Sequence, residues 1–131
     1  MAYPADYRYT KQHEWIRVDG KGVGTIGITD FAQTKIGEVV FVGLPKVGDK
    51  IKAGQEFASV ESVKAVFEIF APASGEIVEV NTALETAPEK VNADPHGAAW
   101  FAKARLTNPD ELKELMDAAG YEAYCPECEA H

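Results

Sequence analysis

Short runs rich in β-branched residues, bounded by turn residues such as glycine, recur along the first part of this chain. Such runs are typical of β-strands. Each strand leaves an apolar face that must be buried against another layer. The sequence therefore predicts a mainly β fold of two small antiparallel sheets, with strands near residues 15–18, 24–28, 38–42, 57–61 and 66–70.

The segments between these runs carry turn and cap signals. A helix of one or two turns is predicted between the second and third runs, with Thr29 or Asp30 as its N-cap and Gly37 at its end. Residues 47–51 resemble residues 74–78, since both combine a glycine with an acid and an isoleucine. Two such halves are expected to pack as a quasi-symmetric sandwich.

The C-terminal region carries the clearest helix pattern. Asn108 can cap the helix, Pro109 suits its first position, and Glu111 completes a capping box. Gly120 is a natural stop. The pattern predicts one helix over residues 109–119 that packs on the sheet through a stripe of Leu112, Leu115, Met116 and Ala119.

Length and composition bound the class of protein. A chain of 131 residues, 46% apolar and 26% charged, is ordinary for one globular domain, which we expect to span residues 1–131. No apolar run approaches the roughly 18 residues that a membrane span needs. Residues 1–6 lack the basic start and apolar core of a secretory signal, so we expect a cytoplasmic protein.

The charge balance restricts the classes of partner that the protein can bind. Asp and Glu number 21 against 13 Lys and Arg, which gives a net charge of −8. The excess is concentrated in residues 108–131, where Lys113 is the only lysine or arginine. An acidic chain without a basic stripe does not suit nucleic acid or an anionic membrane surface. Proteins or small molecules are the expected partners.

Motifs of autonomous catalysis are missing from the sequence. The chain has no Gly-x-Ser-x-Gly, no His-Glu-x-x-His and no phosphate-binding Gly-x-x-x-x-Gly-Lys. Its histidines, His13, His96 and His131, share no ligand spacing, so we expect no metal site. The sequence therefore favours a protein without catalysis of its own.

Lys64 is the residue that stands out. Other lysines lie among polar or turn residues, whereas Lys64 interrupts an apolar hairpin expected over residues 56–70. A lysine at a hairpin tip can be a solvated turn residue. It can also present an amine for covalent attachment, with a flexible stem that lets the attached group travel. The residues alone leave both interpretations open.

The hairpin sequence resembles a known family. The run Val-Glu-Ser-Val-Lys-Ala-Val at 60–66, followed by Ala-Pro-x-Ser-Gly-Glu at 71–76, is similar to the lipoylation site of the glycine cleavage system H proteins. Further matching blocks follow in the same order along nearly the whole chain, at residues 9–15, 27–33, 37–45, 79–84 and 91–100.

The resemblance implies a fold, a cofactor and a set of partners. The fold is the flattened lipoyl/biotinyl-type sandwich of two antiparallel sheets (barrel-sandwich hybrid), with short helices and a C-terminal helix. The cofactor is lipoic acid in an amide with Lys64, which makes the protein a non-catalytic carrier. The partners are glycine decarboxylase, aminomethyltransferase, dihydrolipoyl dehydrogenase and the enzyme that attaches lipoate.

The resemblance also implies site residues besides Lys64. Glu14 and Glu68 match positions near the loaded arm, where a carboxylate can hold the cationic aminomethyl group; the alternative is that both are ordinary surface acids. The residues that flank the attachment lysine are Glu61, Ser62, Val63 and Ala65. Val63 and Ala65 also separate this chain from biotin carriers, which have Met-Lys-Met, and from 2-oxoacid dehydrogenase lipoyl domains, which have Asp-Lys-Ala.

The hairpin departs from the family pattern after Val66. Residues 67–70 are Phe-Glu-Ile-Phe where the family has Ser-Asp and then Tyr, so the arm is expected beside a bulkier apolar patch or a more deeply packed strand. A second function therefore stays open, as a lipoate-bearing sulfur carrier for a heterodisulfide-reductase-like complex. A third is an unmodified scaffold that binds partner enzymes.

The tail, residues 121–131, contains Cys125 and Cys128. A Cys-x-x-Cys pair can be redox-active or bind metal, but a structural zinc site needs four ligands and at most three lie here. Nearby acids disfavour the thiolate form. The sequence favours a frayed, inert tail.

Overall fold

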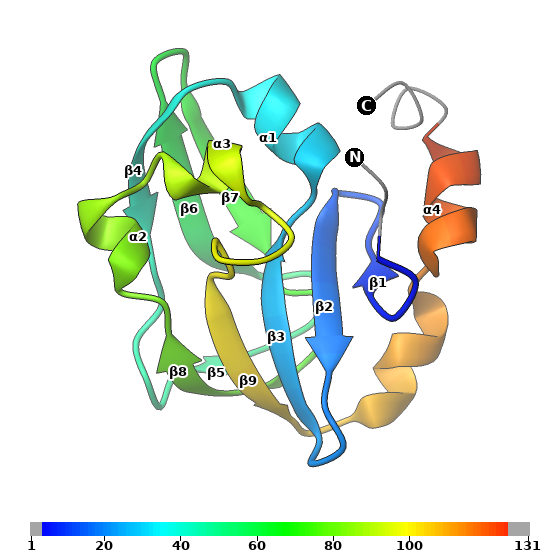
Figure 1. Cartoon of the computed structure of the whole chain (residues 1–131). Helices are drawn as coiled ribbons and strands as arrows, with labels where there is room; N and C mark the ends of the chain where they lie inside the picture. The colour runs from blue at the N-terminus through cyan, green and yellow to red at the C-terminus, as the bar shows by residue number, and fades with distance from the viewer. Residues whose placement is uncertain (1–3, 126–131) are drawn as a thin grey trace.

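The computed structural model describes residues 4–125, and its strands form two antiparallel sheets (Figure 1). The six-stranded sheet has the order β1-β2-β3-β9-β8-β5, and the three-stranded sheet has the order β4-β6-β7. The larger sheet consists of β1 Arg8–Tyr9, β2 Glu14–Val18, β3 Val23–Ile28, β5 Lys50–Ile51, β8 Gly75–Val80 and β9 Ala102–Leu106. The smaller consists of β4 Val39–Gly43, β6 Glu56–Ser62 and β7 Val66–Phe70, so all five predicted strands are confirmed.

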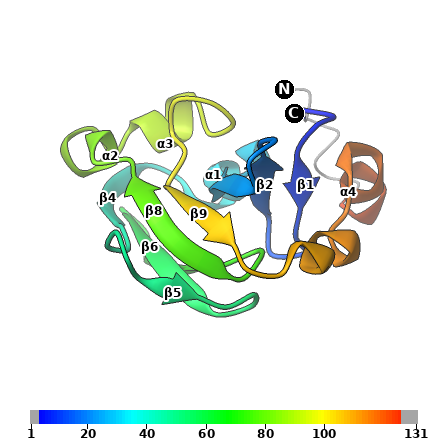
Figure 2. The same cartoon turned by 90° about the horizontal axis from the view of Figure 1, so that it is seen from below.

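The two sheets pack face to face, with the smaller sheet across one side of the larger (Figure 2). One core lies between them, and it contains buried residues from both sheets. Burial of these side chains is the main source of stability, at about 25 cal/mol per Å² of apolar surface. The most buried members include Ile16, Ile26, Val42, Val60, Ile77, Ala102 and Ala104. The predicted sandwich is confirmed.

The two similar segments, 47–51 and 74–78, lie side by side in one sheet. β5 pairs with β8 in antiparallel register, and Gly48 N donates to Ile77 O at 2.8 Å while Ile77 N donates to Asp49 O at 2.8 Å. The similarity therefore reflects local pairing. The sheets themselves are unequal, with six and three strands, so the expected quasi-symmetric halves are not what the fold shows.

The short helix predicted between the second and third runs is confirmed as α1, Asp30–Ile36. Thr29 caps it by accepting a hydrogen bond from Ala32 N at 3.2 Å, and Gly37 ends it with φ of 87°. Two one-turn helices, α2 Ala83–Thr86 and α3 Lys90–Ala93, follow β8. Within residues 4–125, every helix is too short or too polar to cross a membrane.

The single helix predicted over residues 109–119 is wrong. A 3-10 helix covers Pro109–Glu114, and a separate α4 covers Ala118–Tyr124. Between them the chain is extended, because Met116 pairs with Tyr9: Tyr9 N donates to Met116 O at 2.8 Å and Met116 N donates to Tyr9 O at 2.9 Å. A contact between residues far apart in sequence thus interrupts the helical pattern.

The predicted caps of that helix also have other roles. The Glu111 carboxylate accepts from Ser74 N at 2.7 Å and from Ser74 Oγ at 2.9 Å, so it anchors the 3-10 helix to the turn before β8. Asn108 makes no side-chain cap. Asp117 caps α4 by accepting from Gly120 N at 2.7 Å, which places Gly120 inside α4 instead of at a helix end.

α4 packs beside β1 at the edge of the larger sheet (Figure 1). It completes a second cluster of buried residues, formed by Tyr7, Tyr9, Trp15, Phe31, Tyr121 and Cys125. Tyr121 and Cys125 are buried, so residues 121–125 of the predicted tail belong to the fold, and the rest of that tail lies outside the described residues. Cys128 lies outside the described residues.

Candidate functional site

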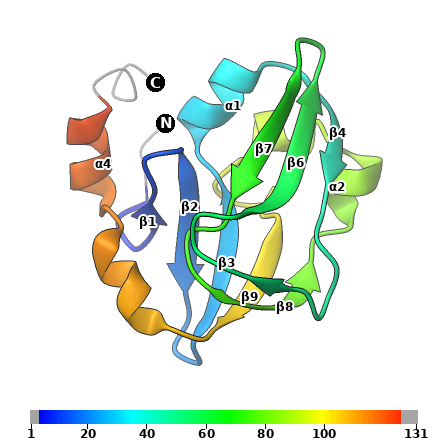
Figure 3. The same cartoon turned by 180° about the vertical axis from the view of Figure 1, so that it is seen from behind.

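The hairpin predicted over residues 56–70 is formed by β6 and β7, and its turn projects beyond the rest of the fold beside α1 (Figure 3). Ser62 N donates to Ala65 O at 2.9 Å, which closes the turn around Lys64. Ser62 Oγ accepts from Lys64 N at 3.1 Å and from Ala65 N at 3.3 Å. Val63 N donates to the Glu38 carbonyl at 3.1 Å, so the backbone of the turn is well fixed.

The Lys64 side chain is exposed and lies over Gly37, the residue that ends α1. A Cβ at Gly37 would lie 3.3 Å from Lys64 Cε and 3.6 Å from its Nζ. No carboxylate of residues 4–125 lies within ion-pair distance of the amine. Val63 and Val66 beside it are 66% and 63% exposed. An acyl group on Lys64 would therefore break no ion pair within this part of the chain.

Two of the bulky residues after Val66 point into the protein. Ile69 is buried and Phe67 is partly buried, and both pack against the main core. Val66 and Glu68 alternate with them and are exposed. Phe70 shares the face of Val66 and Glu68 and is partly buried. Of the two alternatives for this departure from the family pattern, Phe67 and Ile69 therefore support a more deeply packed strand, while Phe70 lies on the other face.

One edge of β7 has no neighbouring strand within residues 4–125. The pairing of β6 with β7 directs the backbone N–H groups of Val66, Glu68 and Phe70 toward this edge. At its end, Phe70 N donates to Glu14 Oε2 at 3.2 Å. The open edge thus runs from the Lys64 turn to the Glu14 carboxyl.

Glu14 is only 2% exposed, so the alternative that it is a surface acid is wrong. Its Oε1 accepts from Thr10 Oγ1 at 2.5 Å, and its Oε2 accepts from Phe70 N. Burial raises the pKa of the Glu14 carboxyl to about 6, although both hydrogen bonds oppose the shift. Glu68, the other acid of the family pattern, is exposed.

The sequence does not identify Thr10 or Gly37 as residues of the site. Thr10 stands in a block that matches the family, but its hydrogen bond to Glu14 depends on a turn that no local pattern reveals. Gly37 was identified as a helix end, and its contact with Lys64 arises only when the hairpin folds over α1.

The described histidines are structural. His13, with φ of 71°, has its Nδ1 2.6 Å from the Tyr121 hydroxyl, and burial lowers its pKa. His96 Nε2 accepts from Asp30 N at 3.0 Å. Both therefore link chain segments, and neither lies in the turn that presents Lys64.

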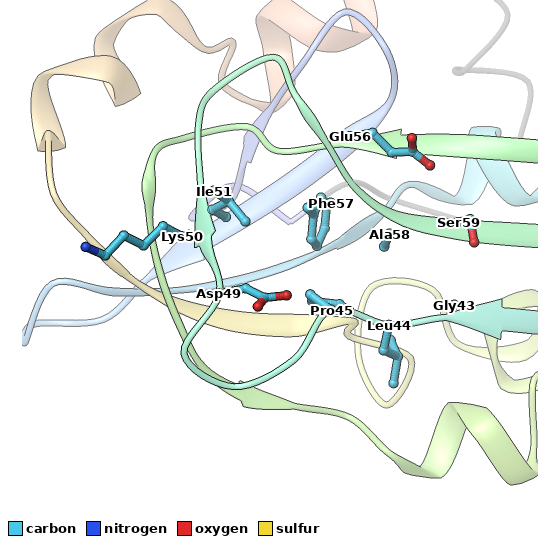
Figure 4. A pocket seen from close by; sticks show the side chains of 10 residues that line it. All are labelled: Gly43, Leu44, Pro45, Asp49, Lys50, Ile51, Glu56, Phe57, Ala58 and Ser59. Atoms are coloured by element: carbon cyan, nitrogen blue, oxygen red, sulfur yellow. The ribbon is translucent and has the colours of Figure 1, made fainter.

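A pocket of about 440 Å³ opens between the end of β4 and the beginning of β6 (Figure 4). Since the Lys64 turn follows the other end of β6, this pocket is separate from that turn. Its lining residues are Gly43, Leu44, Pro45, Asp49, Lys50, Ile51, Glu56, Phe57, Ala58 and Ser59.

A sandwich of two antiparallel sheets with a lysine displayed at a hairpin turn defines a class of carrier proteins, in which the lysine bears a prosthetic group. The family described as Glycine cleavage H-protein matches residues 7–128. The chain therefore belongs to the glycine cleavage H-protein family, whose members carry covalently attached lipoate and have no catalytic activity.

Individual relatives agree with this assignment. The chain is 59% identical to the glycine cleavage system H protein of Koribacter versatilis and 55% identical to that of Acidobacterium capsulatum, and both matches cover 100% of each chain. The crystal structure of an H protein from Mycobacterium marinum superposes with a TM-score of 0.85 at 41% identity, covering 92% of this chain and 97% of that one. The resemblance and the fold predicted from sequence are both confirmed.

Proposed function

We propose that Lys64 carries lipoate and that the arm shuttles the aminomethyl group of glycine from glycine decarboxylase to aminomethyltransferase, with reoxidation by dihydrolipoyl dehydrogenase. The observation that carries the proposal is an exposed lysine, free of carboxylates in residues 4–125, at the tip of a fixed turn. The bound lipoyl group supplies thiol–disulfide chemistry. We assign this work to the cytoplasm, where thiols stay reduced.

The turn suits attachment and presentation. Amide formation removes the lysine charge, and the exposed Val63 and Val66 give the acylated stem apolar neighbours. The backbone around Lys64 is held by Ser62, so movement is confined to the side chain. The lipoate-attaching enzyme and the other partners can then approach the same exposed turn.

Glu14 supports the handling of a cationic cargo. From Val66 to Phe70, β7 advances roughly 13 Å at about 3.3 Å per residue, and a lysine side chain with an eight-carbon acyl group has a reach of the same order. Above its pKa of about 6 the Glu14 carboxylate can hold an ammonium group away from bulk water. Exposed Glu68 adds a second acid beside the open edge of β7.

The test is the intact mass of lipoylated protein incubated with glycine and glycine decarboxylase. We expect a glycine-dependent gain of mass in the wild type and none in Lys64→Ala. A lipoylated protein that stays unloaded beside a working H protein would contradict the glycine role; sulfur loading by a heterodisulfide-reductase-like complex would then be tested. Absence of lipoylation in a lipoylating host would instead indicate the unmodified scaffold.

A further inference from the structure

The turn that carries Glu14 is organised by the hydroxyl group of Thr10. Thr10 N donates to Glu14 O at 2.9 Å, which closes the turn. Thr10 Oγ1 accepts from Gln12 N at 3.2 Å and from Glu14 N at 3.1 Å. Because these two donors occupy the lone pairs of the hydroxyl oxygen, its hydrogen is left to donate to Glu14 Oε1 at 2.5 Å.

We propose that Thr10 is a positioning residue for the carrier cycle: its hydroxyl fixes Oε1 of Glu14 and stabilises the carboxylate that receives the cationic amine of the cargo. The inference rests on the proposed function, since it concerns the holding of an amine at Glu14. It adds a residue that does not itself contact the cargo. Thr10 also borders a cavity of about 390 Å³ beside the 3-10 helix, which leaves room around the turn.

The charges around Glu14 leave the Thr10 hydroxyl as one of the few groups that stabilise its carboxylate. Burial raises the pKa of Glu14, and only the hydrogen bonds from Thr10 and Phe70 lower it. The acids of the neighbouring elements, Glu68 of β7 and Asp30 of α1, do not contribute to the pKa shift of Glu14. The adjacent His13 ring faces Tyr121 and Phe31, and burial lowers its pKa, so it adds no positive charge at neutral pH. Without the Thr10 hydroxyl, the buried Glu14 carboxylate keeps only the hydrogen bond from Phe70 N among these two.

Two variants separate positioning from folding. Thr10→Val keeps the shape of the side chain but removes the donor, so the pKa of Glu14 rises further and the carboxyl is protonated nearer to neutral pH. Thr10→Ser keeps the hydroxyl and should restore the wild-type behaviour. A merely structural role for Thr10 would lower stability without moving the titration of Glu14.

The first experiment uses the unlipoylated protein and follows the Glu14 carboxyl carbon by NMR from pH 4 to pH 9. We expect the Thr10→Val inflection about one pH unit above that of wild type, the order expected for one hydrogen bond to a charged group. Thr10→Ser should titrate like wild type. The inference is overturned if Thr10→Val titrates like wild type, or if Thr10→Ser moves as far as Thr10→Val.

A second measurement follows loss of the glycine-derived mass from loaded protein between pH 6 and pH 9. For Thr10→Val we expect loss about fivefold faster than wild type near pH 7, because the protonated fraction of Glu14 rises from about a tenth to about a half when its pKa moves from about 6 to about 7. The absolute rates should converge at higher pH as Glu14 ionises in both proteins. Equal rates at every pH would contradict the inference. Failure of the wild type to load would instead count against the proposed function, while the NMR titration would still decide the role of Thr10.

Discussion

The attachment turn and the Thr10–Glu14 turn lie at opposite ends of one strand edge and are built in opposite ways. The attachment turn, residues 62–65, is exposed, and the stem of Lys64 there lies over Gly37. The Thr10–Glu14 turn is buried next to the aromatic cluster, with both carboxylate oxygens of Glu14 occupied by donors. One region presents a group to solvent, and the other removes a charge from solvent.

This difference follows from what each end must do. Under the proposed function several enzymes approach Lys64 in turn, so this lysine must be accessible, and an exposed ammonium costs little to keep in water. A carboxylate gains strength as a partner for a cation when water is excluded, because electrostatic interactions grow in a low dielectric. That strength has a cost, since a buried charge destabilises the folded protein. Removal of the charge should therefore leave stability unchanged at the exposed end and raise it at the buried end.

The largest expected effect is complete loss of lipoylation in Lys64→Arg. The guanidinium of arginine stays protonated and is not a nucleophile under these conditions, so no amide can form. Unfolding by denaturant should be unchanged, because Lys64 is exposed and unpaired with any carboxylate of residues 4–125. Intact mass after expression in a lipoylating host gives the result.

Lys52→Arg is the matched control for that experiment, since Lys52 is also an exposed turn lysine. It should be lipoylated like wild type. A lipoyl mass retained in Lys64→Arg would place the attachment point elsewhere and would remove the basis of the comparison.

Glu14→Gln should also impair the carrier function, but here stability should be gained. The folded-state pKa of Glu14, about 6, lies above its ordinary value of 4.5. The protonated carboxyl therefore stabilises the fold below pH 4.5, and this stabilisation disappears as pH rises through about 6. The difference corresponds to about 2 kcal/mol at neutral pH.

The measurement is the free energy of unfolding of wild type and Glu14→Gln at pH 4.5 and pH 7. The stability of Glu14→Gln relative to wild type should increase from pH 4.5 to pH 7, because the amide has no charge to bury. Glu68→Gln, an exposed acid on the neighbouring strand, is the control and should show no comparable gain. A Glu14→Gln protein that is less stable by the same amount at both pH values would disprove the buried-charge interpretation.

Gly37→Ala tests the support beneath Lys64. The φ of 87° at Gly37 is strained for alanine by roughly 1–2 kcal/mol, and the added Cβ would lie 3.3 Å from Lys64 Cε. We expect Gly37→Ala to lower the free energy of unfolding by this amount and to change the rate of lipoylation. Gly20→Ala is the control, because a Cβ there meets nothing within 4 Å and φ is ordinary. Equal stability of the two variants would contradict the assigned strain.

Sequence reasoning succeeded where local pattern decides structure. The strands, α1 with its Thr29 cap, and the hairpin that presents Lys64 depend on residues close together in the chain. It failed where distant segments meet. The helix over residues 109–119 is interrupted by pairing of Met116 with Tyr9, and the burial of Glu14 depends on the packing of β2 beside the end of β7.

The smallest expected effect is that of Ser62→Ala at the attachment turn. Ser62 Oγ accepts from Lys64 N and Ala65 N, but the turn is exposed, so water can replace both bonds. We expect a loss of about 0.5–1 kcal/mol in unfolding free energy and full lipoylation. Ser59→Ala, in the same strand, is the control and should change stability less, since Ser59 is not part of the turn. If Ser62→Ala abolished lipoylation while the fold persisted, lipoylation would depend on the ordered backbone of the turn as well as on the exposure of Lys64. The two ends would then both depend on fixed structure, and the comparison between them would fail.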